Sequence, residues 1–332
     1  MDKDDKLLSK ETRKRDNMNL QKEILAKIEA FDTIIIHRHV IPDGDAYGSS
    51  FGLRELIREN FENKNVYLVG EELDYLGYIG RVDEIEDSMY ENALVIITDT
   101  SNAARISDDR YKLGAYKIKI DHHPFSDEYA DLEWIDTSFP STCEMITDLM
   151  IQNNLKLNEL GAMCLYNGIV SDTGRFLFRG VSERTMAYAG KLLNYGFDVT
   201  NLYSAMYTRT KDVARFSGYA VMNFEETPNG VGYLKLTDEQ LNALNITEEQ
   251  ASANVNLLAN IEGIKIWAFF VECKEAGDIR VNLRSSGAAV NEVAKKYGGG
   301  GHVQASGARV ANFSIVDDVV ADLDALASSA TK

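Results

Sequence analysis

The sequence predicts an α/β protein of two domains, the first built on a mainly parallel sheet with helices on both faces. Its 332 residues exceed one ordinary domain and suit two. Up to about residue 196, short β-branched runs alternate with stretches of helical spacing, which is typical of parallel strands joined by helices. After about residue 222 the pattern changes, which indicates a smaller second α/β domain.

The elements of the first domain, residues 18–196, follow in chain order. A mixed-charge segment, residues 1–17, predicts a flexible, solvated tail, and helical spacing begins at residues 21–31. Compact apolar runs predict buried strands at 33–37, 65–69, 93–98 and 116–120. The expected helices, with Asp45 and Asn158 in N-cap positions, cover 49–60, 140–153, 159–170 and 182–195.

The second domain is expected at residues 223–332. Before it, residues 197–222 predict a helical linker, because the stretch from about 201 to 219 is polar and periodic. The linker stretch is an alternative candidate for a homodimer contact. The domain itself is expected to contain strands at 233–236, 264–271 and 279–283, a helix at 290–297, and a last helix from 316.

Composition excludes some classes of function. The formal net charge of −17 argues against a protein that grips long nucleic acid, which needs a basic face. A short nucleotide substrate remains compatible with this net charge, because metal ions can bind its phosphates locally. No apolar run reaches the ~18 residues of a membrane span. The scattered cysteines Cys143, Cys164 and Cys273 are interpreted as reduced core residues, which favours the cytoplasm.

Polar side chains gather where the predicted strands end. In open α/β sheets the ligand crevice lies beyond the carboxyl ends of the strands, so these side chains are expected to form an active site. The residues in such positions are His39, Asp43, Asp45, Asp99, Asp121, His122 and His123.

These side chains suit metal ions. Imidazoles mixed with carboxylates favour Mn²⁺, Fe²⁺ or Co²⁺ over the all-oxygen sites of Mg²⁺. Any single Asp after a strand is more often a helix cap, but all five histidines lie in three Gly-, Pro- or Asp-rich breaks. Two ions ~3.5–4 Å apart are a common device for phosphoester hydrolysis. The ligands available for two ions are His39, Asp43, Asp45, Asp99, His122 and Asp172.

A second candidate site lies in the second domain. Gly298–Gly301 precede His302, and backbone N–H groups without side chains can approach a phosphate closely. Arg284 and Ser285 end a predicted strand and could add a charged fork for phosphate. The alternatives are a flexible turn and a surface arginine.

These motifs together resemble the DHH phosphoesterase superfamily over nearly the whole chain after the tail. Residues 39–46 resemble its first motif, Asp99 the second, Asp121-His122-His123 the third and Asp172 the fourth, while residues 298–302 resemble the signature of the associated DHHA1 domain. The two-domain plan is most similar to the stand-alone bacterial nanoRNase and pAp phosphatase group (NrnA-like), which includes the DhhP-type enzymes acting on c-di-AMP or pApA.

The resemblance implies a role for each motif residue. His39 and Asp43 would bind one ion, Asp99 would bridge, and the second ion would be bound by Asp45, His122 and Asp172. His123 would stand beside the scissile phosphate and Asp121 would orient a histidine. The implied cofactors are two divalent ions, Mn²⁺ before Mg²⁺ or Co²⁺. The residues that would hold the far end of the substrate, across a cleft between the domains, are Arg284, Ser285, Gly299, Gly300, Gly301 and His302.

The implied function is metal-dependent hydrolysis of short oligoribonucleotides and linear dinucleotides such as pApA to nucleoside monophosphates. Hydrolysis of pAp to AMP and of c-di-AMP are further implied activities. The alternatives are a RecJ-like single-strand exonuclease, which would be expected to carry a basic track, a family II pyrophosphatase, which lacks the glycine–histidine domain, and a non-catalytic nucleotide sensor, which would be expected to lose ligands.

Overall fold

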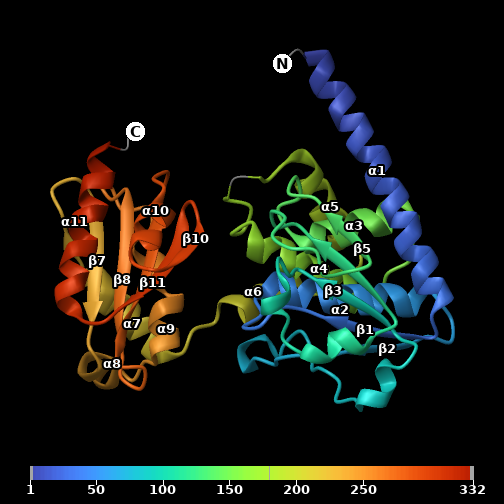
Figure 1. Cartoon of the computed structure of the whole chain (residues 1–332), viewed down its shortest axis with the longest axis horizontal. Coiled ribbons are helices and arrows are strands. Elements are labelled where there is room, and N and C mark those ends of the chain that lie inside the picture. Colours follow the sequence, from blue (N-terminus) through green and yellow to red (C-terminus); the bar gives the residue numbers. More distant parts are fainter. Residues whose placement is uncertain (1–2, 179, 330–332) are drawn as a thin grey trace. The chain divides into compact units, whose positions relative to one another are not determined.

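The computed structural model describes residues 3–178 and 180–329 and divides the chain into two units, Met1–Tyr207 and Thr208–Lys332 (Figure 1). The predicted α/β class is confirmed in both. Residues 1–2 of the expected tail and the last three residues of the expected second domain lie outside the described residues.

The first unit contains a five-stranded sheet of order β2-β1-β3-β4-β5, in which every neighbouring pair is parallel. The isoleucine and valine side chains of the inner strands β1, β3 and β4 are fully buried, as expected for strands covered on both faces. Four strands lie where the sequence predicts them, and the short β5 was not predicted. The bounds are β1 Thr33–His37, β2 Asn65–Leu68, β3 Leu94–Thr98, β4 Tyr116–Asp121 and β5 Leu132–Ile135.

The two faces of this sheet are covered differently. The large core on one face contains side chains from α-helices, whereas the opposite face carries a smaller cluster around Ile35, Val95, Tyr90 and Tyr111. Both faces therefore carry helices, as predicted, but those on the second face are only short 3₁₀ helices. The α-helices are α1 Lys3–Ala30, α2 Gly44–Asn60, α3 Thr142–Gln152, α4 Glu159–Asp172, α5 Glu183–Leu193 and α6 Val199–Tyr207, and the 3₁₀ helices are η1 Asp74–Leu76, η2 Asp87–Tyr90, η3 Ala103–Arg105 and η4 Asp109–Leu113.

Helices α2 and α4 approach each other closely through glycine. A Cβ on Gly48 would lie 2.4 Å from the carbonyl oxygen of Cys164, and one on Gly44 would lie 2.6 Å from Ser171 Oγ. Only glycine fits such contacts. Helix α2 begins at Gly44 with Asp43 as its N-cap, so the prediction of Asp45 as the cap is wrong. Asn158 caps α4 as predicted.

Two further differences concern the tail and the linker. Helix α1 begins at Lys3, so it extends through most of the segment expected to be a tail (Figure 1). The linker contains two helices, α6 and α7 Lys211–Asn223, because Thr210 caps a new helix with its side chain. Leu202 of α6 belongs to the core of the first unit and Phe216 of α7 to that of the second.

The second unit contains a mixed six-stranded sheet of order β10-β11-β9-β8-β7-β6, in which only β7 and β8 pair in parallel. Its two faces carry separate apolar cores. Its strands are β6 Glu225–Glu226, β7 Val231–Leu236, β8 Ile266–Cys273, β9 Asp278–Ser285, β10 Gly300–His302 and β11 Ala305–Val310, and its further helices are α8 Asp238–Leu244, α9 Glu248–Ala253, η5 Val255–Leu258, α10 Val290–Lys296 and α11 Phe313–Ser329. Within residues 3–178 and 180–329, no helix has the length and apolar character needed to cross a membrane.

Candidate metal centre

The carboxyl ends of β1, β3 and β4, which are neighbours in the sheet, bring most of the predicted ligands together. Asp43 and Asp45 come from the start of α2, and Asp172 ends α4. Three groups of side chains have ligand atoms that all lie within 4.8 Å of one another. They are His39–Asp43–Asp99, Asp45–His122–Asp172 and Asp99–His122–His123.

The first group is centred on His39. Its Nε2 lies 3.6 Å from Asp99 Oδ2 and 4.0 Å from Asp43 Oδ1. Its Nδ1 donates to the carbonyl of Val40 at 2.7 Å, which directs Nε2 towards the carboxylates. Burial lowers the pKa of His39, but the hydrogen bond and charge of Asp99 and the charge of Asp43 outweigh it, so the pKa is raised.

The second group is centred on His122. Its Nε2 lies 3.2 Å from Asp172 Oδ2 and 3.9 Å from Asp45 Oδ2. This buried nitrogen has no geometrically satisfactory hydrogen bond among the described residues. Burial opposes the charged imidazole, but the carboxylates of Asp172, Asp99 and Asp45 raise the pKa of His122 to about 10. Burial and the charges of Asp43 and Asp99 raise the pKa of Asp172 to about 6, against the effect of His122.

Asp99 is shared between the groups. Its Oδ1 lies 3.5 Å from His122 Nε2 and accepts a hydrogen bond from Thr142 Oγ1 at 3.1 Å. Its backbone has a φ of 52°, in the left-handed region that Asp tolerates better than most residues. Burial raises the pKa of Asp99, but hydrogen bonding to His39 and the charges of the three histidines outweigh it, so the pKa is lowered.

Asp45 is held by the N-terminus of α3. Its Oδ2 accepts from Thr142 N at 2.7 Å and its Oδ1 from Cys143 N at 2.9 Å. A helix N-terminus favours a carboxylate. Nevertheless, burial and the charges of Asp99 and Asp172 raise the pKa of Asp45 well above its ordinary value. So much negative charge in a buried space fits divalent cations, which the mixed imidazole and carboxylate donors suit.

His123 and Asp121 form a pair beside these groups. His123 Nδ1 lies 2.8 Å from Asp121 Oδ1 and 3.5 Å from Asp99 Oδ1, so its nearest carboxylate is Asp121. The backbone N–H of His123 donates to the same Asp121 oxygen at 3.2 Å. Asp121 is fully buried. This arrangement is the one expected for a carboxylate that orients a histidine.

Sequence reasoning missed the donors that hold two of the carboxylates. Thr142 and Cys143 provide them, near the start of the helix that was predicted at 140–153. Cys143 was assigned to the core only, and it is indeed fully buried. Its sequence position gave no sign that its N–H contacts Asp45. His37, which belongs to none of the ligand groups, is fully buried with its Nε2 3.0 Å from Tyr90 Oη.

The candidate substrate residues of the second unit gather at one end of its sheet. The register places Arg284 opposite Ala305, and Ala305 opposite His302, so Arg284 and His302 lie on the same face. Among the described residues, Arg284 forms no ion pair, and burial lowers the pKa of its guanidinium. Ser285 is buried and its hydroxyl donates to the Ala288 carbonyl at 2.6 Å.

The glycine segment is only partly a loop. Gly300, Gly301 and His302 form β10, paired with β11, so the expectation of an open glycine loop is wrong for these residues. A Cβ on Gly299 would lie 2.1 Å from the carbonyl oxygen of Gly307, which explains the glycine by close packing of β11.

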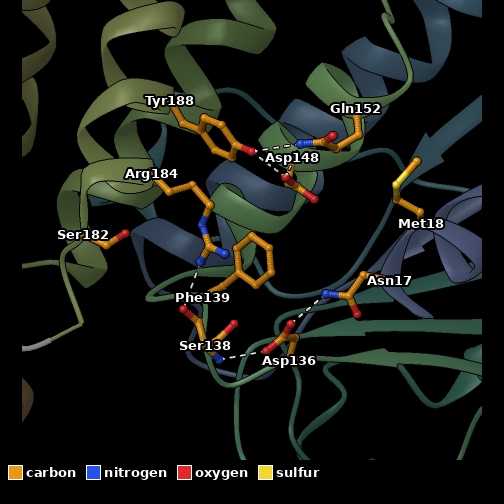
Figure 2. A pocket seen from close by; sticks show the side chains of 10 residues that line it. All are labelled: Asn17, Met18, Asp136, Ser138, Phe139, Asp148, Gln152, Ser182, Arg184 and Tyr188. Atoms are coloured by element: carbon orange, nitrogen blue, oxygen red, sulfur yellow. Dashed lines mark hydrogen bonds between the residues drawn. The ribbon is translucent and has the colours of Figure 1, made fainter. Parts of the chain in front are cut away.

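A separate cavity of about 450 Å³ lies in the first unit, and none of the candidate ligands lines it (Figure 2). Its polar side chains bond mainly to one another. Tyr188 Oη donates to Asp148 Oδ1 at 2.5 Å, and Arg184 Nη2 donates to the carbonyl of Ser138 at 2.9 Å. Because these groups are satisfied internally, the cavity does not compete with the candidate metal centre as an active site.

Comparison with known proteins identifies the family. A model of the DHH family, N-terminal domain, matches residues 33–169, and a model of the DHHA1 domain matches residues 232–329. The bifunctional oligoribonuclease and PAP phosphatase NrnA of Bacillus subtilis (strain 168) is 43% identical over 310 residues, which cover 92% of this chain and 98% of that protein. The chain belongs to the DHH family.

Other similarities agree with a DHH protein that carries a DHHA1 domain. A probable bifunctional oligoribonuclease and PAP phosphatase NrnA of Streptococcus mutans is 43% identical over 306 residues, 92% of this chain and 98% of that protein. The fold is shared with the crystal structure of an exopolyphosphatase-related protein from Bacteroides fragilis, with a TM-score of 0.84, 24% identity, and coverage of 94% and 98% of the two chains. The DHH match spans all five strands of the first sheet.

Proposed function

We propose that this DHH protein is a metal-dependent phosphoesterase that hydrolyses short oligoribonucleotides and linear dinucleotides such as pApA to nucleoside monophosphates, and pAp to AMP. The observation that carries the proposal is the position of Asp99, which belongs to the His39 group and whose Oδ1 lies 3.5 Å from Nε2 of His122 in the second group. Two neighbouring cation sites are a device for displacement at phosphorus. The similarity to relatives named as oligoribonuclease and PAP phosphatase supports the choice of substrates.

The proposed cofactors are two divalent ions, Mn²⁺ in the first place, with Mg²⁺ and Co²⁺ as alternatives. When bound, they supply Lewis-acid stabilisation of phosphoryl oxygens and activation of water. The proposed ligands are His39 and Asp43 for one ion, Asp45, His122 and Asp172 for the other, and Asp99 for both.

His123 is proposed to stabilise the charge that develops on the scissile phosphate. Its Nδ1 side is occupied by Asp121 at 2.8 Å, so the opposite nitrogen of the ring, Nε2, is the one directed to substrate. Asp121 thereby sets the orientation of the ring.

Arg284, Ser285, His302 and the segment Gly299–Gly301 are proposed to hold the remainder of the substrate. A partly buried guanidinium with no carboxylate partner within the described residues suits a phosphate, which it can bind through two parallel hydrogen bonds. The limited number of such groups, on a chain of net charge −17, favours a short substrate over long nucleic acid. The three buried free cysteines fit a reducing compartment, so we place the reaction in the cytoplasm.

The test is a substrate panel with purified protein and Mn²⁺. The expected result is release of AMP from pApA, a short oligoadenylate and pAp, and little activity on single strands too long for one binding site. The panel also includes c-di-AMP, to measure activity on a cyclic dinucleotide. Binding of pApA without release of AMP would favour a nucleotide sensor, and equal activity on long single-stranded DNA would favour a RecJ-like exonuclease. Either result would overturn the proposal.

A further inference from the structure

A lysine is buried within β4, an inner strand of the first sheet. Lys119 lies between Ile118 and Ile120, and none of its surface is exposed. An ammonium group in such a position is costly unless it is paired. Neither the metal centre nor the proposed roles of its residues explains why it is there.

The contacts of Lys119 connect two segments of the candidate site. Its Nζ donates to the carbonyl of Ser101 at 2.8 Å, two residues after Asp99. The same Nζ lies 3.7 Å from Asp121 Oδ2 and 4.5 Å from the ring centroid of Tyr129. The hydroxyl of Tyr129 donates to the carbonyl of the residue before Ser101, at 2.5 Å. Lys119 therefore joins Asp121 to the turn that carries Asp99.

The two oxygens of Asp121 have different surroundings. Oδ1 faces His123, with 2.8 Å to Nδ1 and 3.2 Å to the backbone nitrogen. Oδ2 is buried and has no hydrogen-bond partner among the described residues. Lys119 is the cation that faces Oδ2, so one oxygen serves His123 and the other the lysine.

We propose that Lys119 is a positioning residue, whose ammonium holds the Asp121 carboxylate in the place from which it orients His123 towards the phosphate. The inference rests on the proposed phosphoesterase function, because it acts through the role of His123. Among the residues assigned to the site, Asp121 is the one whose side chain faces the Lys119 ammonium, so the inferred effect on the reaction passes through Asp121. If Lys119 only stabilised the fold, its substitution would lower the amount of folded protein without a loss of kcat that depends on Asp121 and His123.

The first experiment compares Lys119→Met with Lys117→Met in the Mn²⁺-loaded protein. Lys117 is the matched control, because it lies two positions earlier on the same strand and pairs with Asp131 at 3.5 Å, at the far end from the site. Loss of a residue that orients an active-site group typically costs about 10–100-fold. We expect a kcat for pApA that is lower by this factor in Lys119→Met, with an unchanged KM and Mn²⁺ affinity, and wild-type kinetics in Lys117→Met. A wild-type kcat in Lys119→Met would overturn the inference.

The second experiment repeats the lysine substitution where His123 is absent. In a His123→Ala background, Lys119→Met should cause little further loss of kcat, because coupled residues are not additive. An equal loss in both backgrounds would show that Lys119 does not act through His123 and would contradict the inference.

A third comparison applies if the Lys119→Met protein does not fold. That substitution leaves the buried Asp121 carboxylate without its cation, which is destabilising. The double variant Lys119→Met/Asp121→Asn removes both charges and is compared with Asp121→Asn. Equal kcat values support the inference, and a further loss in the double variant overturns it. Wild-type protein without activity on any substrate would instead contradict the proposed function. The two failures are therefore distinguishable.

Discussion

The most specific structural prediction concerns Gly168, where three helices of the metal centre meet. A Cβ on this residue of α4 would lie 2.1 Å from Cys143 Sγ and 2.7 Å from Asp45 Oδ1. Carbon atoms in ordinary contact are ~3.5–4.0 Å apart. The Gly168→Ala substitution should therefore displace the start of α3 and the carboxylate of Asp45 together.

The effect of Gly168→Ala on stability is measured against a matched control variant, Gly190→Ala. Gly190 is also helical, and a Cβ there would meet nothing within 4 Å. We expect Gly190→Ala to stabilise the first unit by about 0.5–1 kcal/mol, the usual gain for alanine in a helix. Gly168→Ala has the same gain but adds overpacking, which costs about 1–3 kcal/mol. The difference between the two variants isolates the overpacking, and Mn²⁺ affinity should fall about 10–100-fold only in Gly168→Ala.

The assay uses the distribution of tryptophan. The chain has two tryptophans, Trp134, which is fully buried in the first unit, and Trp267 in the second. In a Trp267→Phe background, urea unfolding followed by fluorescence reports the first unit alone. Calorimetric titration with Mn²⁺ gives the affinity. If Gly168→Ala matched Gly190→Ala in both stability and Mn²⁺ affinity, the close approach of α4 would not be what positions Asp45.

Three further predictions address substrate and metal binding. Gly299→Ala should raise the KM for pApA severalfold, because its Cβ would meet a backbone carbonyl of β11 at 2.1 Å, whereas Gly287→Ala, with nothing within 4 Å, should match wild-type protein in steady-state kinetics. Arg284→Ala should raise the KM about 10-fold or more through loss of a charge-assisted hydrogen bond, while Arg280→Ala on the same strand face should not; equal KM values would contradict the assignment. Saturating Mn²⁺ at about 100 times its dissociation constant should stabilise the first unit by about 2.7 kcal/mol for each ion bound, relative to EDTA-treated protein, and a shift confined to the tryptophan of the second unit would argue against the site.

The sequence predicted the location of the site because strand ends are marked by composition. The β-branched runs of β1, β3 and β4 are recognisable, and the polar residues directly after them must lie at one edge of a parallel sheet. Asp99, His122 and Asp45 could therefore be placed together without coordinates. The assignment of Asp45 as a cap failed because Asp43 and Asp45 both suit that position, and only the hydrogen bonds made by Asp43 distinguish them.

The remaining features depend on contacts between segments distant in sequence. The N–H groups of Thr142 and Cys143 reach Asp45 across 97 and 98 positions, so no local pattern indicates them. The lysine at position 119 is indistinguishable in sequence from the exposed alternate residues of an edge strand. Next to β11, two residues of the glycine segment have no room for a Cβ, and this restriction is visible only in the structure, where the partner strand is in place.

The central claim, two cations sharing Asp99, is tested most directly by counting the Mn²⁺ ions bound per chain in wild-type protein and in Asp99→Asn. Asn suits this change because it tolerates the left-handed φ of 52° at this position. The account predicts two ions bound to wild-type protein, fewer than two in Asp99→Asn, and loss of pApA hydrolysis with it. Wild-type protein that hydrolyses pApA with a single bound ion, or a fully active Asp99→Asn variant, would contradict it.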